Sequence, residues 1–374
     1  MKNRLAEKSR AALYILCAAT VLACAGFLTP DSDLYAQTEI RISPEEFNRI
    51  VTGFSETGGY FQTDNWVSNE LTYLDVIESI EQNAGTGGVY IGVGPEQNYT
   101  YISAVRPDVA FIMDIRHLNK MQHLAYKILF EISDTRIEFL SHLFSIPVDM
   151  EQVPGRAANA GELFSFLSGK LTDEHMMNKT RDKVLDVLTD KYTFELTGRD
   201  SLTINYVFRN FRLYNMNITY RGARRSWYPT LRAVMTLSDD TGAYSNPFNS
   251  RGGYEYLREM HLENRIIPVT GDFGGTKALN MIGNFARSHG MTVTAYYVSN
   301  VEEYVFRNRA LWVQWAENVM SLPITERSVF IRWTHERSGY YQQTRLQYIE
   351  AFIGNYRSSL YRMYSDLKTL DYIK

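Results

Sequence analysis

Short apolar runs bounded by turn residues recur along the chain and alternate with helical patterns. Five of these runs predict buried strands: residues 88–94, 108–114, 265–272, 291–298 and 328–334. Helical patterns over residues 95–106 and 276–289 connect the paired runs. Because neighbouring parallel strands need such crossover helices, the alternation predicts an α/β fold with a mostly parallel sheet and helices on both faces.

Apolar residues three and four positions apart predict further helices. Residues 42–54 form one of them, with Ser43 as N-cap and Glu46 as its capping-box partner. Residues 68–82 form another, with this apolar face: Leu71, Leu74, Ile77 and Ile80. Between the two strand–helix–strand units, residues 118–263 are mainly helical in pattern, which predicts a large helical insertion on the sheet.

The C-terminal tail from Arg345 also has regular apolar spacing. Its apolar positions continue over about three heptads: Leu346, Ile349, Ile353, Tyr356, Leu360, Met363, Leu367 and Leu370. This pattern predicts a helix docked on the sheet. The same face is alternatively the seam of an oligomer, an interpretation that Gly354 in its middle weakens.

The first 36 residues differ from the rest of the chain. A basic head precedes an uncharged apolar run over residues 11–28, and the small residue Ala36 follows, which is the order of a secretory signal or membrane anchor. Three outcomes stay open: cleavage, retention as an anchor, or lipid attachment at Cys24. Each outcome predicts that residues 37–374 are exported and lie in the periplasm, in the medium or on the outer side of a membrane.

The amino-acid composition limits the class of protein, and the kinds of site, that residues 37–374 can form. The chain has 374 residues, of which 45% are hydrophobic and 13% aromatic, so it can bury a sizeable core. A formal net charge of -3 gives no argument for nucleic-acid binding. Both cysteines, Cys17 and Cys24, precede residue 37, so the domain has no disulfide and no thiolate ligand. The histidines lack metal-ligand spacing as well, and we expect no metal site.

A glycine turn follows the first predicted strand. Gly92 and Gly94 lie where this strand passes into the next helix, a position at which a ligand approaches the backbone closely. Asp114 ends the following strand. An acidic residue about 20 positions after such a turn binds ribose hydroxyls in nucleotide-binding units. These residues together predict a small-molecule ligand of the nucleotide type.

With these residues, positions 88–116 resemble the first two motifs of class I S-adenosylmethionine-dependent methyltransferases. The resemblance implies a Rossmann-like domain in which Gly92 and Gly94 hold the methionine part of the cofactor and Asp114 holds its ribose. The whole chain, with its GVGPEQN and TGDFGG turns, also resembles a group of bacterial proteins to which no activity is assigned.

The glycine turn departs from the methyltransferase pattern at two positions. Tyr90 stands where that family has an acidic residue, and Glu96 stands where it has a third glycine. A glutamate at a helix N-terminus repels a phosphate and tolerates a ligand that carries an amine. We therefore expect Glu96, and Asn98 at the end of the turn, to contact such a ligand.

Polar residues before the first strand complete the expected site. We expect Asn65, Glu70 and Tyr73 to lie over the glycine turn, with Glu70 holding the amine of the ligand. Ser68 in the same stretch is alternatively a helix cap. Asp272 ends a later strand, and the resemblance implies a position near the methyl acceptor, which makes it the candidate catalytic residue.

Two other functions stay open at this point. S-adenosylmethionine is a cytoplasmic molecule, so an exported domain is alternatively a non-catalytic ligand-binding or interaction domain that reuses the fold. The unit around residues 269–275, with Asn300 at the end of its second strand, also resembles an NAD(P)-binding βαβ unit, although its glycine spacing fits that fingerprint poorly.

Overall fold

In the residues that the computed structural model describes (40–222, 228–239, 241–335 and 342–373), six strands form one sheet in the order β3-β2-β1-β4-β5-β6. Their bounds are Val89–Gly92 (β1), Val109–Asp114 (β2), Ile266–Thr270 (β3), Val293–Ser299 (β4), Val329–His335 (β5) and Gln342–Tyr348 (β6). The first five strands run parallel, and β6 pairs antiparallel with β5. The five strands predicted from apolar runs are thereby confirmed.

The strand order reverses beside β1, and this reversal positions the site. From β1 the chain proceeds outward to β2 and β3 on one side, and then returns to place β4 and β5 on the other side. The helices that leave β1 and β4 therefore diverge. In open parallel sheets such a switch point leaves a crevice beyond the carboxyl ends of the strands, where ligands bind.

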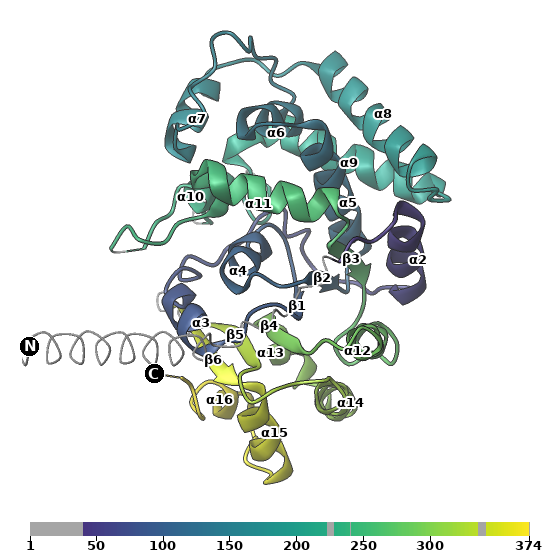
Figure 1. Cartoon of the computed structure of the whole chain (residues 1–374), viewed down its shortest axis with the longest axis vertical. Helices are drawn as coiled ribbons and strands as arrows, with labels where there is room; N and C mark the ends of the chain where they lie inside the picture. The colour runs from purple at the N-terminus through teal and green to yellow at the C-terminus, as the bar shows by residue number, and fades with distance from the viewer. Residues whose placement is uncertain (1–39, 223–227, 240, 336–341, 374) are drawn as a thin grey trace, which may run out of the picture. The chain divides into compact units, whose positions relative to one another are not determined.

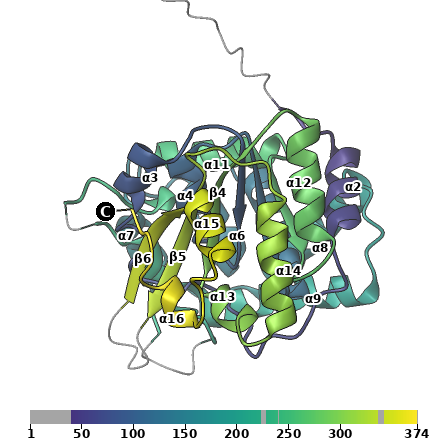
Figure 2. The ribbon, with the colours of Figure 1, turned by 90° about the horizontal axis from the view of Figure 1, so that it is seen from below.

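Helices cover both faces of the sheet, as predicted (Figure 1). One face carries Asn98–Val105 (α4), His117–Ile132 (α5) and Arg251–Leu262 (α11). The other carries Ala278–Ser288 (α12), Arg309–Met320 (α14) and Ile349–Arg357 (α15). Figure 2 shows α12 and α14 side by side on this second face, with Pro44–Phe54 (α2) next to α12. Ser43 caps α2 by accepting the backbone N–H of Glu46, as predicted.

The segment between β2 and β3 is mainly helical, as its pattern predicts. Beyond α5 and α11, which pack near the sheet, it contains Arg136–Phe144 (α6), Ala160–Leu167 (α7), Glu174–Asp190 (α8), Gly198–Tyr214 (α9) and Leu231–Met235 (α10). These helices extend the face that carries α5 (Figure 1). The remaining helices are Ile77–Asn83 (α3), Val301–Val305 (α13) and Tyr364–Leu367 (α16).

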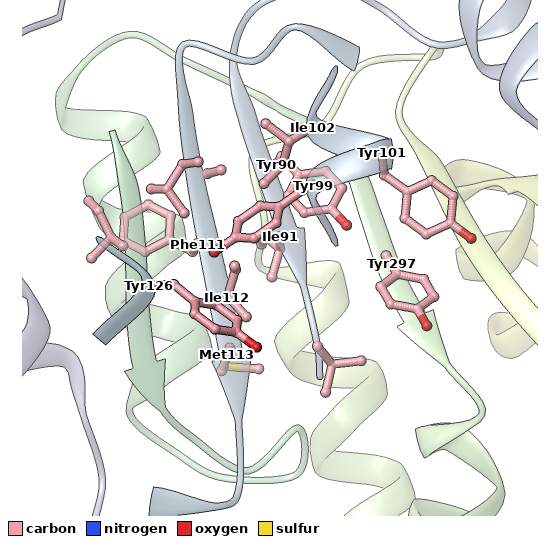
Figure 3. Packing of buried hydrophobic residues seen from close by; sticks show 14 of the residues in the cluster. Tyr90, Ile91, Tyr99, Tyr101, Ile102, Phe111, Ile112, Met113, Tyr126 and Tyr297 are labelled. Atoms are coloured by element: carbon pink, nitrogen blue, oxygen red, sulfur yellow. The ribbon is translucent and has the colours of Figure 1, made fainter. Parts of the chain in front are cut away.

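The core forms around the central strands because these are apolar on both faces. Every residue of β1, β2 and β3 is buried. Tyr90 and Ile91 of β1 lie beside Phe111 and Ile112 of β2 (Figure 3). Each large apolar side chain buried in this way contributes about 1.5–3 kcal/mol to the hydrophobic stabilisation.

The helix predicted over residues 68–82 is shorter than expected, since only α3 forms. Residues 68–76 are loop and turn because Ser68 and Glu70 turn inward and hydrogen-bond to Gln97. Ser68 is therefore not a helix cap. Contacts with a distant segment have replaced the local helical preference here.

The long C-terminal helix is also a wrong prediction. Residues 342–348 form β6, and the helical residues that follow are divided between α15 and α16. Leu346 is buried in β6, whereas Leu360 is 45% exposed and Met363 is 59% exposed. The tail thus has no continuous apolar helical face of the kind on which the alternative of an oligomer seam depended.

The expected signal or anchor segment, residues 1–36, lies outside the described residues. Within the described part of the chain, no helix is both long and apolar enough to cross a membrane.

Candidate functional site

A cavity of about 270 Å³ lies at the carboxyl ends of the central strands. It is lined by Gly94 and Pro95 after β1, by Asp114 and Arg116 at the end of β2, by Asp272 and Phe273 after β3, and by Tyr297 and Ser299 of β4. Residues 60–70 supply a further wall. This is the crevice at which the reversed strand order favours ligand binding.

Only one glycine of the turn after β1 faces the cavity. Gly94 has φ +82°, a conformation that favours glycine, and a side chain there would meet open space. Gly92 instead packs against Tyr90 and Asn98, whose atoms would collide with a Cβ atom. The amide of Asn98 donates to the carbonyls of Pro95 at 2.8 Å and Val93 at 3.0 Å. Gly92 and Asn98 therefore shape the turn, and neither lines the cavity in which their contacts with a ligand are predicted.

Asp114 lies in the cavity wall, but its carboxylate is already paired. Its Oδ1 accepts the backbone N–H of Arg116 at 2.8 Å and the Nε–H of the same residue at 2.9 Å, and its Oδ2 accepts from the guanidinium Nη2. Both side chains are almost fully buried. The end of β2 thus presents an Asp114–Arg116 ion pair, which sequence reasoning missed even though Arg116 lies two residues after the predicted ribose-binding carboxylate.

Glu70 and Asn65 line the cavity as predicted, whereas Tyr73 does not. Glu70 is 3% exposed; its carboxyl accepts hydrogen bonds from the Ser299 hydroxyl and from the Gln97 amide at 2.8 Å. Burial raises the pKa of Glu70 to about 7, and these hydrogen bonds act against the rise. Tyr73 is fully buried elsewhere and donates to the carbonyl of Val234 at 2.7 Å.

Glu96 does not line the cavity, although the sequence predicts a ligand contact for it. Its side chain is 2% exposed and accepts the backbone N–H of Ser68 at 3.0 Å. Its second oxygen, Oε2, has no hydrogen-bond partner among the described residues. Burial raises the pKa of this carboxyl to about 7. Glu96 fixes the loop that carries Glu70.

Glu96→Gln is expected to stabilise the domain at pH 8 and to leave its stability at pH 5 nearly unchanged. Because the folded state binds the Glu96 proton more tightly than the unfolded state, this carboxyl lowers folding stability as the pH rises from 4.5 to about 7. The amide keeps the acceptor for Ser68 and carries no charge. The expected gain at pH 8 is about 1–3 kcal/mol by urea unfolding. Equal gains at both pH values would contradict this explanation.

Asp272 lies at the opposite side of the cavity from Ser299, because β2 and β1 separate β3 from β4. Next to it, the carboxylate of Glu56 fills the N-terminus of α12. Glu56 accepts backbone N–H groups from Asp272 at 3.2 Å, Lys277 at 3.1 Å and Ala278 at 2.8 Å. A phosphate would need these same donors. The carboxylate of Glu56 therefore argues against an NAD(P) pyrophosphate at this turn.

Aromatic rings form much of the remaining wall: Tyr60, Phe61, Tyr220, Phe273, Tyr297 and Tyr304. Phe61 and Tyr304 meet edge to face with ring centroids 5.3 Å apart. The charged lining residues in the described chain are Glu70, Asp114 and Asp272 against Arg116, so the carboxyl groups outnumber the cation. Aromatic faces and excess carboxylate favour an organic cation over an anion. No local sequence pattern marks these rings, because they come from segments far apart.

These features define the molecule as an α/β domain with a cavity at the switch point of a mostly parallel sheet. The chain matches the family model described as a domain of unknown function (DUF7790) over residues 65–146 and 174–368, and it belongs to that family. No curated protein matches it. The matched ranges include all six strands and the cavity residues from Asn65 onward, whereas Glu56, Tyr60 and Phe61 precede them.

Proposed function

We propose that this Rossmann-like domain binds S-adenosylmethionine in the cavity and transfers a methyl group to a small acceptor. The observation that carries the proposal is the cavity itself: it lies at the switch point, it has aromatic walls, and carboxyl groups exceed cations in its lining. S-adenosylmethionine carries an adenine ring that stacks on aromatic faces and a sulfonium cation that such faces attract.

The lining residues fit this ligand in distinct ways. Gly94 lets it approach the backbone, and the pair of Phe61 and Tyr304 offers a stacking surface. Glu70 offers a carboxyl that has no cationic partner within the described part of the chain. S-adenosylmethionine supplies an electrophilic methyl group when it is bound. The protein contributes alignment of the acceptor, for which Asp272 is the candidate positioning residue. Asp114 is a weaker candidate for holding the ribose than its position in the chain implies, because Arg116 occupies its carboxylate.

A second candidate function is non-catalytic binding of an organic cation outside the cytoplasm. Aromatic rings and carboxyl groups are sufficient for such binding, and the predicted export segment would separate the domain from cytoplasmic S-adenosylmethionine. An NAD(P)-dependent oxidoreductase is disfavoured by Glu56 at the N-terminus of α12.

Titration calorimetry of the full chain with S-adenosylmethionine, S-adenosylhomocysteine and NAD tests the proposal. We expect micromolar binding of the first two and a loss of about tenfold or more in Tyr304→Ala, because a base stacked on an aromatic ring gains about 1–3 kcal/mol. Tyr256→Ala is the matched control, since this tyrosine packs under Arg106 outside the cavity. Binding of NAD alone, or no difference between the two variants, would overturn the assignment.

A further inference from the structure

Glu70 differs from the other buried acids of the protein. Four acidic residues of the described chain are buried: Glu70, Glu96, Asp114 and Glu302. Asp114 pairs with Arg116, and Glu302 pairs with Arg332. Neither Glu70 nor Glu96 has a cationic partner among the described residues, and of these two only Glu70 lines the cavity. Buried carboxylates are normally paired, so a carboxyl that lacks a cation and faces a cavity points to a cationic group supplied by the ligand.

The surroundings of Glu70 hold its carboxyl in place. The Ser299 hydroxyl donates to Oε1, and the Gln97 amide donates to Oε2. Ser299 ends β4 with a backbone φ of +49°, which is unusual for a residue other than glycine. The register between β4 and β5 is irregular at the same place. Gln97 is fixed in turn by the hydroxyl groups of Ser68 and Tyr101. The Tyr297 side chain hydrogen-bonds the same carboxyl. Two carboxyl oxygens offer about four acceptor positions, so these contacts still leave room for a further donor.

We infer that Glu70 and Ser299 form a subsite for a primary ammonium group, and that the ammonium displaces a proton from the Glu70 carboxyl when it binds. This inference rests on the proposed function and specifies its ligand class: an adenosyl compound that keeps its amino-acid part. The displaced proton passes to solvent, and the resulting carboxylate pairs with the ammonium.

The titratable groups that face Glu70 do not compete for this role. Tyr90 of β1 and Tyr101 of α4 act on it electrostatically, and Tyr297 of β4 also hydrogen-bonds its carboxyl. Burial raises the pKa of each phenol well above its ordinary value, so all three stay neutral. Glu96 contacts the same loop through Ser68. Because the pKa of Glu70 is about 7 in the free protein, about half of these carboxyls are protonated at pH 7. Binding of an ammonium therefore tightens as the pH rises through 7.

Calorimetry of the full chain in two buffers of different ionisation enthalpy measures the proton directly. The probes are S-adenosylhomocysteine, which carries the ammonium, and 5′-methylthioadenosine, which lacks the amino-acid part. For S-adenosylhomocysteine we expect release of about half a proton at pH 7 and an affinity about five- to tenfold higher at pH 7.5 than at pH 6. We expect no proton release and no such pH dependence for 5′-methylthioadenosine.

Two variants show whether the released proton comes from Glu70 or from another buried carboxyl. Glu70→Gln is expected to abolish proton release and to weaken S-adenosylhomocysteine about tenfold, while unchanged affinity for 5′-methylthioadenosine shows that the variant is folded. Glu96→Gln removes a carboxyl with a similarly raised pKa outside the cavity and is expected to keep proton release intact.

The outcomes distinguish the two proposals. Binding of both probes without proton release, or proton release that persists in Glu70→Gln, overturns the ammonium subsite and leaves the proposed function standing. Failure of both probes to bind overturns the proposed function, and the subsite with it.

Discussion

Asp114→Ala is expected to destabilise the domain by about 3–5 kcal/mol, in addition to any effect on ligand binding. The substitution removes the counter-ion of the largely buried Arg116 guanidinium, which keeps a hydrogen bond to the backbone carbonyl of Asp64 and a contact with the Phe61 ring. Removing one partner of a buried ion pair costs about this much, because the remaining charge stays largely desolvated without its counter-ion. Urea unfolding measures the loss as a lower midpoint.

A double-mutant cycle provides the control for this pair. Arg116→Met removes the cation and keeps much of the apolar side chain, so Asp114→Ala combined with Arg116→Met is expected to recover a large part of the stability lost in Asp114→Ala alone. If Asp114→Ala instead keeps full stability and only loses S-adenosylmethionine binding, then the carboxylate is free for a ribose, as the methyltransferase resemblance implies, and the ion pair contributes little.

Gly92→Ala is expected to cost about 3 kcal/mol, through packing and without any ligand. An alanine Cβ atom at this position would lie 2.7 Å from the Tyr90 ring and would collide with Asn98 Oδ1, and both neighbours are fully buried. A shift of Asn98 breaks the hydrogen bonds of its amide to the turn carbonyls, and a shift of Tyr90 breaks the bond that its hydroxyl donates to Asn98 Oδ1. Overpacking at a site that cannot relax costs about 1–3 kcal/mol or more.

Gly53→Ala is the matched control, because nothing lies within 4 Å of its added Cβ atom and alanine favours the helix that contains it. We expect its unfolding free energy to be unchanged or slightly higher. Thermal and urea unfolding without ligand compare the two variants. A Gly92→Ala protein of normal stability that fails to bind S-adenosylmethionine would show that this glycine serves the ligand after all.

The candidate site was only partly predictable from the sequence. Gly94, Asn65, Glu70, Asp114 and Asp272 do line one cavity, because glycine turns and strand ends of a parallel sheet meet at a single edge. The partner of each side chain was not predictable. The sequence offers no sign that Arg116 occupies Asp114, that Glu96 turns inward, or that Glu56, 216 positions before Asp272, fills the start of α12.

The amino-acid sequence by itself determined the five parallel strands and their crossover helices. A short apolar run between turn residues is buried as a strand whichever strands become its neighbours, so its secondary structure follows from the local sequence. Where the local pattern is compatible with more than one secondary structure, only the tertiary structure decided which one forms. The pattern from Arg345 onward predicts a helix, yet residues 345–348 lie in β6, where pairing with β5 satisfies their backbone groups and buries Leu346. Residues 68–76 are not helical because Ser68 donates a hydrogen bond to Gln97 and Glu70 accepts one from it, and these bonds form only once the sheet brings the segments together.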